Sequence, residues 1–391
     1  MRDRLIASSP GKALAAVELV LSLGWNGMRH RLPRRHLQAW IAMPRAPKSS
    51  RAGVLTPDAI AAWSALLDRA EAFRDLAPWR WINGTSLLGV RDHRSGQTDW
   101  CSIMGQGGET FGVVIYPGDA GLSSLSRMLG DVPDEFDAVI QQFALVLTFN
   151  DRDYVTKDMA AVLKACGRRY RGANAWPELI VHDPGYFPMP PRDIEHLRRI
   201  TTVLESLLEM CAQAAKQPGW DMHDAQDRPW VATLDASGMI AVVREAMPTI
   251  EAAPLPVVPI DEVAVARVRA KPRRAGSAVL IDWFVGSAVI DGPEAEGRPY
   301  FITHVMAFDP SSGMILGVEM GRLAEVWEDT AKLILKISES TGVPAQVILR
   351  RPEALTIMGP LAAALGTDLS LRPETADVIR HFRDQLGAFG R

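Results

Sequence analysis

The sequence predicts an α/β protein with mixed α+β sheets, built from two tandem domains that repeat one element order. Its 391 residues exceed the length of one typical domain, about 100–200 residues. Apolar residues make up 47% of the chain and charged residues 23%, proportions typical of a folded soluble protein. Short β-prone runs and helical periodicity alternate as β-β-β-α-β-α-β-α on either side of a proline-rich stretch.

The first 51 residues form a basic segment that we expect to be a disordered arm outside both domains. It holds ten Lys and Arg residues against two acids, Asp3 and Glu18. The rest of the chain holds 33 basic and 44 acidic residues, so a globally basic nucleic-acid binder is not expected. Met43 is an alternative start, and the sequence leaves open whether residues 1–51 are native.

We expect the first α/β domain over residues 52–245, beginning with a helix near Thr56. Thr56 can cap the helix, Pro57 suits its first turn, and Asp58 favours the positive N-terminal end. Three β-prone runs follow, separated by turn-rich segments, and predict an antiparallel meander. The expected elements after the first helix are strands over 86–91, 99–104 and 110–116, a helix over 118–129, a strand over 143–149, a helix over 157–166, a strand over 178–182, a helix over 192–216 and an extra hairpin over 230–243.

A linker rich in proline and arginine is expected over residues 246–276, where five prolines favour a stiff, extended path. The second α/β domain is expected over residues 277–391, with the same order of elements as the first. Its expected elements are a strand over 278–290, a hairpin with strands over 300–308 and 314–320, a helix over 323–340, a strand over 346–349, a helix over 353–365, a strand over 368–371 and a helix over 376–386.

Three antiparallel strands followed by α-β-α-β-α is an order that resembles the ribonuclease H-like fold. In the second domain, the segments AVLIDWF, VMAFDPSSGMILGVEM and GVPAQVILRRPEAL resemble the first strand, the hairpin and the fourth strand of an integrase core. The resemblance implies two-metal catalysis by carboxylates on the first strand, the fourth strand and a late helix. Asp282 stands at the first position, and Glu374 or Asp377 could fill the last. Arg350 and Arg351 stand where the second acid is expected, and two guanidiniums there would repel Mg²⁺.

The first domain has an incomplete acidic set of a different kind. Asp151 and Asp153 follow its fourth strand, while its first strand carries no acid before Asp92 at its end. Neither half therefore supplies enough oxygen ligands for two metal ions, and we predict no metal site and no cofactor. If the protein were an enzyme, the candidate catalytic residues would be Asp282, Asp151 and Asp153.

Most of residues 55–391 resemble a bacterial family whose two domains are known only as domains of unknown function. The segments that carry this resemblance are WCSIMGQGGETFGVVIYPGDAGL (100–122), FNDRDYV (149–155), RRYRGANAWPELIVHDPGYFP (168–188) and GRPYFITHVMAFDPSSGMILG (297–317). The resemblance implies a two-domain soluble bacterial protein and implies no activity.

Two further features have structural interpretations. The glycine-rich segment over 105–112 lies between two expected strands, so it predicts a hairpin turn rather than a phosphate-binding loop before a helix. Cys101, Cys166 and Cys211 are widely spaced, and we expect small buried side chains in a reducing cytosol. No run approaches the ~20 apolar residues of a membrane span.

The segment over 168–188 is the most unusual part of the chain and the predicted binding site. Its aromatic rings, an arginine and an amide suit a flat ligand, a base or a peptide segment. The predicted binding residues are Arg171, Asn174, Trp176, Tyr186 and Phe187. In the structural alternative, which we favour, Trp176 and Phe187 fill the core and Arg171 pairs with Asp151 or Asp153.

From these observations we expect a non-catalytic, cytoplasmic binding or interaction protein on a degenerate ribonuclease H-like scaffold. The alternative is a nucleic-acid-processing enzyme, a metal-dependent nuclease or a transposase-like protein, with an atypical acidic site. A third hypothesis is a small-molecule enzyme that uses the region of Arg171, Asn174 and Trp176. The sequence names no partner; a protein and a nucleic acid both stay open, and a membrane is not expected.

Overall fold

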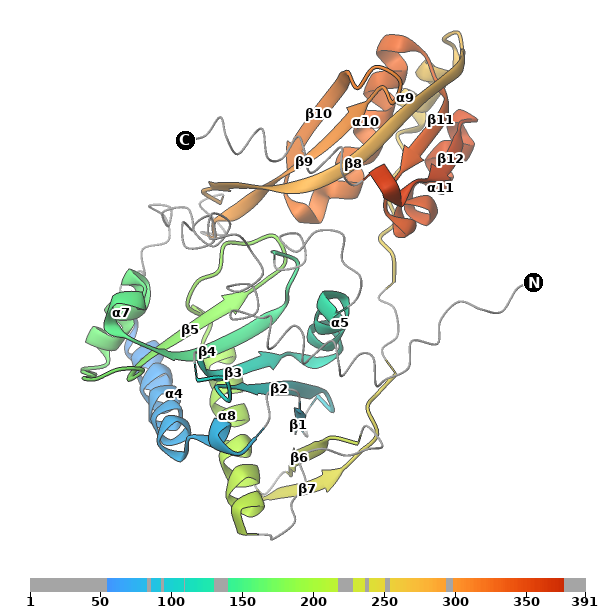
Figure 1. Cartoon of the computed structure of the whole chain (residues 1–391). Coiled ribbons are helices and arrows are strands. Elements are labelled where there is room, and N and C mark those ends of the chain that lie inside the picture. The colour runs from blue at the N-terminus through green and yellow to red at the C-terminus, as the bar shows by residue number, and fades with distance from the viewer. Residues whose placement is uncertain are drawn as a thin grey trace. The chain divides into compact units, whose positions relative to one another are not determined.

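The computed structural model divides into two compact units, which are described separately (Figure 1). Among the described residues, the first unit consists of 55–184 with 188–249, and the second of 185–187 with 254–375. The residues described are 55–375, without 83–85, 93–94, 109, 130–139, 217–227, 236–238, 250–253 and 293–297. The arm predicted over 1–51 and the helix expected over 376–386 lie outside them.

The first helix, α4 (Pro57–Leu76), begins where the sequence predicts. The Thr56 hydroxyl oxygen accepts a hydrogen bond from the Ala59 backbone N–H at 3.2 Å, which satisfies one of the free donors of the first turn. Trp63 and Phe73 lie on the buried face of the helix. The predicted cap and the predicted apolar face are both confirmed.

The first unit is built on a seven-stranded sheet with the order β5-β4-β3-β2-β1-β6-β7. All neighbouring strands run antiparallel except β1 and β6, which are parallel. The β1-β2-β3 meander and the β6-β7 hairpin therefore agree with the prediction. The strands are β1 (Leu87–Asp92), β2 (Thr98–Met104), β3 (Phe111–Tyr116), β4 (Ala144–Asn150), β5 (Trp176–His182), β6 (Trp230–Leu234) and β7 (Ile240–Arg244).

The expectation that both domains share one topology is wrong. In the first unit, β4 pairs antiparallel with β3, whereas a ribonuclease H-like order would place it parallel to β1. The free edge of β1 is taken instead by β6, which comes from much later in the chain. Element order constrains strand pairing only weakly, because the same sequence of strands and helices is compatible with either edge of the meander.

Helices cover both faces of this sheet (Figure 1). On one face, α4 packs with α7 (Lys157–Ala165) and α8 (Ile194–Lys216) over the larger hydrophobic core. On the other face, α5 (Gly118–Leu129) places Leu122 and Leu125 against Trp100. The strands of the sheet centre are consequently apolar on both sides, as their continuous apolar sequences indicate.

The second unit contains a five-stranded sheet with the order β10-β9-β8-β11-β12. The β8-β9-β10 strands are antiparallel, while β11 is parallel to β8 and β12 to β11. The strands are β8 (Arg274–Ile290), β9 (Tyr300–Phe308), β10 (Ile315–Gly321), β11 (Pro344–Leu349) and β12 (Asp368–Leu371). Its helices are α9 (Glu262–Arg269), α10 (Val326–Thr341) and α11 (Pro352–Leu365).

Helix α9 lies inside the segment 246–276 that was interpreted as a linker. Val265 and Val268 of this helix are buried, so the second unit begins before residue 277.

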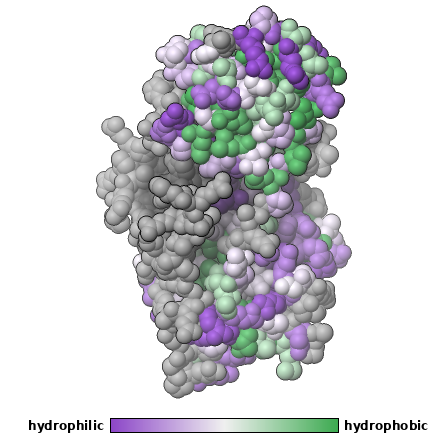
Figure 2. Space-filling model, turned by 90° about the vertical axis from the view of Figure 1, so that its right-hand side faces the viewer, coloured by the Kyte–Doolittle hydropathy of each residue, from purple (hydrophilic) through white to green (hydrophobic). Residues whose placement is uncertain are grey.

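Figure 2 shows hydrophobic surface between hydrophilic patches on this unit, at the top of the view. Over the described part of the chain, no helix combines the length and the apolar character that crossing a bilayer requires.

Candidate functional site

Asp282, the first acid of the implied metal site, lies on β8 with 4% of its surface exposed. Arg350 and Arg351 follow directly after β11, the parallel neighbour of β8. Arg350 Nε donates to Asp282 Oδ2, and Arg351 Nε donates to Asp282 Oδ1 at 3.4 Å. The structure therefore brings these three residues together, and two guanidiniums hold the carboxylate.

Little space remains around this Asp282 cluster. The Arg351 guanidinium lies 3.6 Å from the centre of the Trp283 ring, and its Nη2 donates to the Trp283 carbonyl at 3.2 Å. Trp327 from α10 meets Trp283 edge-on, with 6.3 Å between ring centres. The free volume is about 10 Å³, which is roughly the room that one water needs. The cluster is a closed ion pair and offers no open position to a substrate.

The donor set also disfavours a metal ion at this position. A hard divalent cation needs several oxygen ligands, and Asp282 is one carboxylate beside two cations. Within the described ranges, no group of three or more His, Cys, Asp or Glu side chains is arranged to hold a metal.

The other two candidate acids belong to the first unit and do not join Asp282. Asp151 and Asp153 follow β4 and are both exposed. Asp151 Oδ1 accepts the backbone N–H of Asn174 at 2.8 Å, so this carboxylate shapes a turn. Two exposed aspartates, one of which is used to cap a turn, do not have the arrangement of a general acid–base pair in a closed site.

The three cysteines give no activated nucleophile. All three thiols are free, Cys101 and Cys211 are buried, and Cys166 is partly buried. Burial raises the pKa of each thiol, to about 12 for Cys211. Because the thiolate is the reactive form, these side chains are inert packing groups near neutral pH.

The predicted binding residues divide between the two units. Arg171, Asn174 and Trp176 belong to the first unit, and Tyr186 and Phe187 to the second. Within the second unit, the Phe187 N–H donates to the Pro299 carbonyl at 2.9 Å, and the Phe187 and Phe301 rings lie 5.9 Å apart. Arg298 lies 4.6 Å from the centre of the Tyr186 ring. The five residues therefore do not form one site within either unit.

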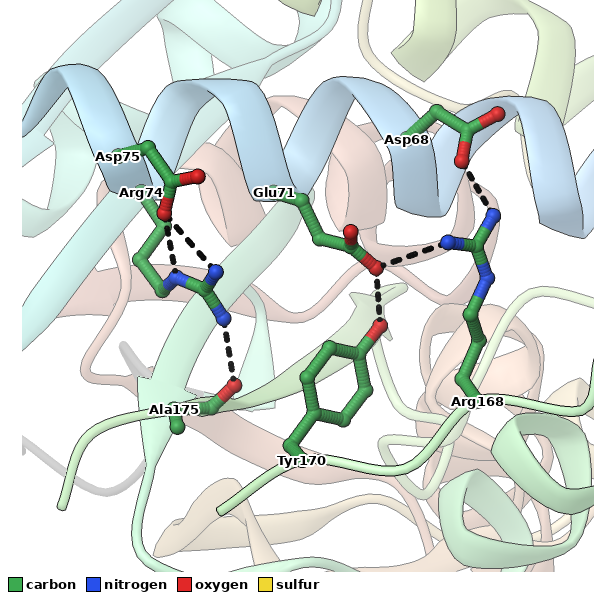
Figure 3. A network of polar contacts seen from close by, with 7 residues as sticks. All are labelled: Asp68, Glu71, Arg74, Asp75, Arg168, Tyr170 and Ala175. Atoms are coloured by element: carbon green, nitrogen blue, oxygen red, sulfur yellow. Dashed lines mark hydrogen bonds and ion pairs between the residues drawn. The ribbon is translucent and has the colours of Figure 1, made fainter. Parts of the chain in front are cut away.

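Arg171 is exposed, which corrects the expectation that it pairs with Asp151 or Asp153. Arg168, three residues earlier, makes the ion pairs of this segment, with Asp68 and with Glu71 of α4. A guanidinium on residue 168 reaches α4 because the chain there runs beside that helix, as Figure 3 shows.

A polar network ties the segment over 168–175 to α4 (Figure 3). The Tyr170 hydroxyl donates to Glu71 Oε1 at 2.7 Å, and burial together with that carboxylate raises the pKa of Tyr170. Arg74 donates from Nε and Nη2 to Asp75 Oδ1 at 3.0 and 2.9 Å, and from Nη1 to the Ala175 carbonyl at 3.1 Å. The backbone just before β5 is thus fixed by side chains of α4.

Trp176 continues this network as a packing residue. Its half-buried ring meets Tyr170 edge-on at 5.8 Å and lies 5.8 Å from the Arg152 guanidinium. It also packs against the larger core. The block over 168–176 is therefore largely a scaffold, which leaves two predicted binding residues exposed, Arg171 and Asn174.

Next to this scaffold lies an open hollow of about 380 Å³, which we call the Trp79 hollow. Pockets for small molecules typically measure about 300–1,000 Å³, so its size is that of a ligand site. It is formed by the end of α4 with the short helix after it, by the β2–β3 turn, and by the loop before β5. Its lining residues are Arg74, Ala77, Trp79, Arg80, Gly105, Gln106, Phe111 and Asn174.

Two residues of the Trp79 hollow have a left-handed backbone. Ala77 has φ 50° and Asn174 has φ 51°, and they are the two non-glycine residues with positive φ among those described. Ala77 ends α4, with its N–H donating to the Phe73 and Arg74 carbonyls at 3.1 Å. Such conformations cost about 1–3 kcal/mol each and concentrate at functional sites. Their coincidence at one hollow marks it as the candidate site.

The sequence analysis identified Asn174 and missed the other lining residues. The turn over 105–112 was predicted correctly as a hairpin, since both of its flanks are the antiparallel strands β2 and β3. Its role in the hollow depends on how close it comes to the end of α4, which no local pattern reveals. The usable signal was APWR (77–80), where an aromatic and a cation follow a helix end directly.

Both units match families defined by their sequences. Residues 63–231 match the family described as "Domain of unknown function (DUF7309)", and residues 264–386 match "Domain of unknown function (DUF6930)". We refer to these two matched regions as the DUF7309 domain and the DUF6930 domain. The Trp79 hollow lies in the DUF7309 domain, and the Asp282 cluster lies in the DUF6930 domain. No curated protein matches the chain.

Proposed function

We propose that the protein is a non-catalytic binding protein whose DUF7309 domain holds a small ligand in the Trp79 hollow. The observation that carries this proposal is the hollow itself, in which two aromatic rings, two arginines and two amides converge. A concave, partly apolar site with a few convergent polar groups is the usual form of a ligand site. Among the described residues that line it there is no activated nucleophile and no pair of acids, which favours binding over catalysis.

For the DUF6930 domain we propose a ribonuclease H-like scaffold that has lost its catalytic acids. Support comes from the sheet order β10-β9-β8-β11-β12 with β9 antiparallel to its neighbours. The Arg350–Asp282–Arg351 cluster fills the position of the implied metal site. This arrangement argues against the alternative of a metal-dependent nuclease or transposase-like enzyme.

We further propose a cytoplasmic location, because three free thiols without a disulfide framework suit a reducing compartment. We also propose that the protein has a further macromolecular partner, either a protein or a nucleic acid. The described residues do not indicate which of the two it is.

Fluorine NMR of the full chain labelled with 5-fluorotryptophan tests the binding proposal. Trp79→Phe assigns the Trp79 resonance, and Trp100→Phe assigns a control from the opposite face of the sheet. Among a library of small planar compounds, we expect some to shift the Trp79 resonance while leaving that of Trp100 in place. If no compound moves Trp79, or if both resonances always move together, the proposal is wrong.

A cleavage assay tests the proposal for the DUF6930 domain. With Mg²⁺ or Mn²⁺ and single- or double-stranded DNA and RNA, we expect no cleavage by the purified protein. Cleavage that disappears in Asp282→Ala would establish the nuclease alternative.

A further inference from the structure

The Trp79 hollow has a rigid aromatic wall. The rings of Trp79 and Phe111 lie 5.3 Å apart, and Phe149 supports Trp79 at 5.9 Å. Gly105 packs directly against both side chains, because a Cβ at this position would lie 2.7 Å from Trp79 Cγ and 2.8 Å from Phe111 Cδ1. The two rings therefore have little room to move on that side. Trp79 itself is only 8% exposed, so the half-buried Phe111 is the ring that this wall offers to a flat ligand. A ring that is fixed before binding loses little conformational entropy when the ligand packs on it.

The charge on the lining of the Trp79 hollow is positive. Arg74 and Arg80 line it, and no described carboxylate does. Arg74 is bound to Asp75 and to the Ala175 carbonyl, whereas the exposed Arg80 makes no ion pair within the described part of the chain. The planar fork of a guanidinium binds carboxylate and phosphate oxygens through two parallel hydrogen bonds. Arg80 is therefore placed to receive an anionic group.

Two amides complete the lining. Gln106 and Asn174 are both exposed, and each side chain offers both donors and an acceptor. The position of Asn174 is set by its left-handed backbone and by the hydrogen bond from its N–H to Asp151. Side-chain amides form paired hydrogen bonds with the edges of nucleobases, which a plain hydrocarbon ring cannot match.

From the wall, the cation and the amides together, we propose that the ligand of the Trp79 hollow is a nucleoside monophosphate. The base packs on the half-buried Phe111 beside the small exposed part of Trp79, the phosphate meets Arg80, and Gln106 and Asn174 bind the edge of the base. The volume of about 380 Å³ suits one mononucleotide rather than a longer strand. This inference rests on the proposed function, because it assigns a ligand class to the same site.

Isothermal titration calorimetry on the full chain tests the ligand class. The probes are AMP, GMP, CMP and UMP, the matching nucleosides, inorganic phosphate, and benzoate as a flat carboxylate. We expect at least one monophosphate to bind about tenfold more tightly than its nucleoside and than phosphate, the effect of one charge-assisted hydrogen bond. Arg80→Gln should remove this advantage while leaving nucleoside binding unchanged. Arg198→Gln, at an exposed arginine outside the hollow, should bind like the wild type.

Three results would overturn the inference. Equal binding of nucleotide and nucleoside, unaffected by Arg80→Gln, would show that the hollow binds a ring without an anion. Benzoate binding as tightly as the best nucleotide would assign a carboxylate ligand instead. Absence of nucleotide binding would reject the class, and the Trp79 resonance would then decide separately whether the hollow binds other compounds and the proposed function stands.

Discussion

Arg350 and Asp282 form an ion pair in which both residues are almost completely buried, at 6% and 4% exposure. The carboxylate lies in the middle of β8, and the guanidinium follows β11, the strand beside it. The pair therefore joins two parallel neighbours at the centre of the sheet. Its contribution depends on both members being present, because either charge alone would be buried without compensation.

Arg350→Met is expected to destabilise the protein by about 3–5 kcal/mol, since it removes the main partner of a buried carboxylate. Urea denaturation of the wild type and the variant measures the change. The double variant Asp282→Leu with Arg350→Met should recover part of the loss, because the fully buried charges are gone and the remaining Arg351 keeps its hydrogen bond to the Trp283 carbonyl. Arg372→Met, in an exposed pair with Glu374, is the matched control and should change little. An Arg350→Met protein as stable as the wild type would contradict the role given to the pair.

Glu178 is expected to make stability depend on pH near neutrality. It lies on β5 with 2% of its surface exposed and accepts hydrogen bonds from the Thr156 hydroxyl at 2.6 Å and N–H at 3.1 Å. Burial raises the pKa of its carboxyl from 4.5 to about 7, although the Thr156 hydrogen bonds oppose this. The folded state thus holds its proton more tightly, and the free energy of unfolding falls as pH rises from about 4.5 to about 7.

Glu178→Gln should therefore be more stable than the wild type at about pH 8, by up to ~3 kcal/mol, and nearly equal to it at about pH 5. Urea denaturation at the two pH values measures both differences. Glu195→Gln, at an exposed glutamate, should leave the pH dependence as it is in the wild type. A Glu178→Gln protein with the full wild-type pH dependence would show that another group is responsible.

Arg168 and Arg171 should respond differently to alanine although they are close in sequence. Arg168 pairs with Asp68 and Glu71 at partial exposure, so its loss is expected to cost about 1 kcal/mol. Arg171 is exposed, and Arg171→Ala should stay within ~0.5 kcal/mol of the wild type. Thermal or urea melts of the two variants compare them directly. A larger loss of stability for Arg171→Ala would support the hypothesis that Arg171 pairs with Asp151 or Asp153.

Gly105→Ala should disturb the Trp79 hollow more than Gly108→Ala does. Both glycines have positive φ, 134° and 80°, so alanine strains the backbone at either position. Only at Gly105 would the new methyl group meet Trp79 and Phe111, since nothing lies within 4 Å at Gly108. We expect an additional loss of about 1–3 kcal/mol for Gly105→Ala, with a shift of the Trp79 fluorine resonance. Equal losses without that shift would contradict the packing described for the wall.

Most helices and strands of the described chain follow from local signals. Thr56 and Pro57 mark the start of α4, and the turn-rich segments between β1, β2 and β3 mark the meander. The pairing of β4 with β3 was not predicted, because the choice between two sheet edges depends on where α8 and the β6–β7 hairpin return. That choice is a long-range packing decision, for which the local sequence has no pattern.

The candidate site was predicted only in part for the same reason. Once the strand order of the second domain was assumed, the charges of Arg350 and Arg351 predicted that they would occupy the place of a metal ion beside Asp282. The Trp79 hollow combines a helix end, a hairpin turn and a loop that are distant in sequence. Its clearest markers are the left-handed backbone conformations of Ala77 and Asn174. The residue types alanine and asparagine do not by themselves predict a positive φ.

The parallel pairing of β1 with β6 affects how the protein is made. Val231 forms a register pair with Gly89, so β1 lacks its second neighbour until the ribosome has added the whole intervening chain. During that interval the nascent domain presents an apolar strand, with Leu88 and Val90, whose N–H and C=O groups along one edge are unpaired. Such an edge is a template for pairing with another chain. Synthesis of this protein therefore passes through a stage that is prone to aggregation and ends when the β6–β7 hairpin emerges.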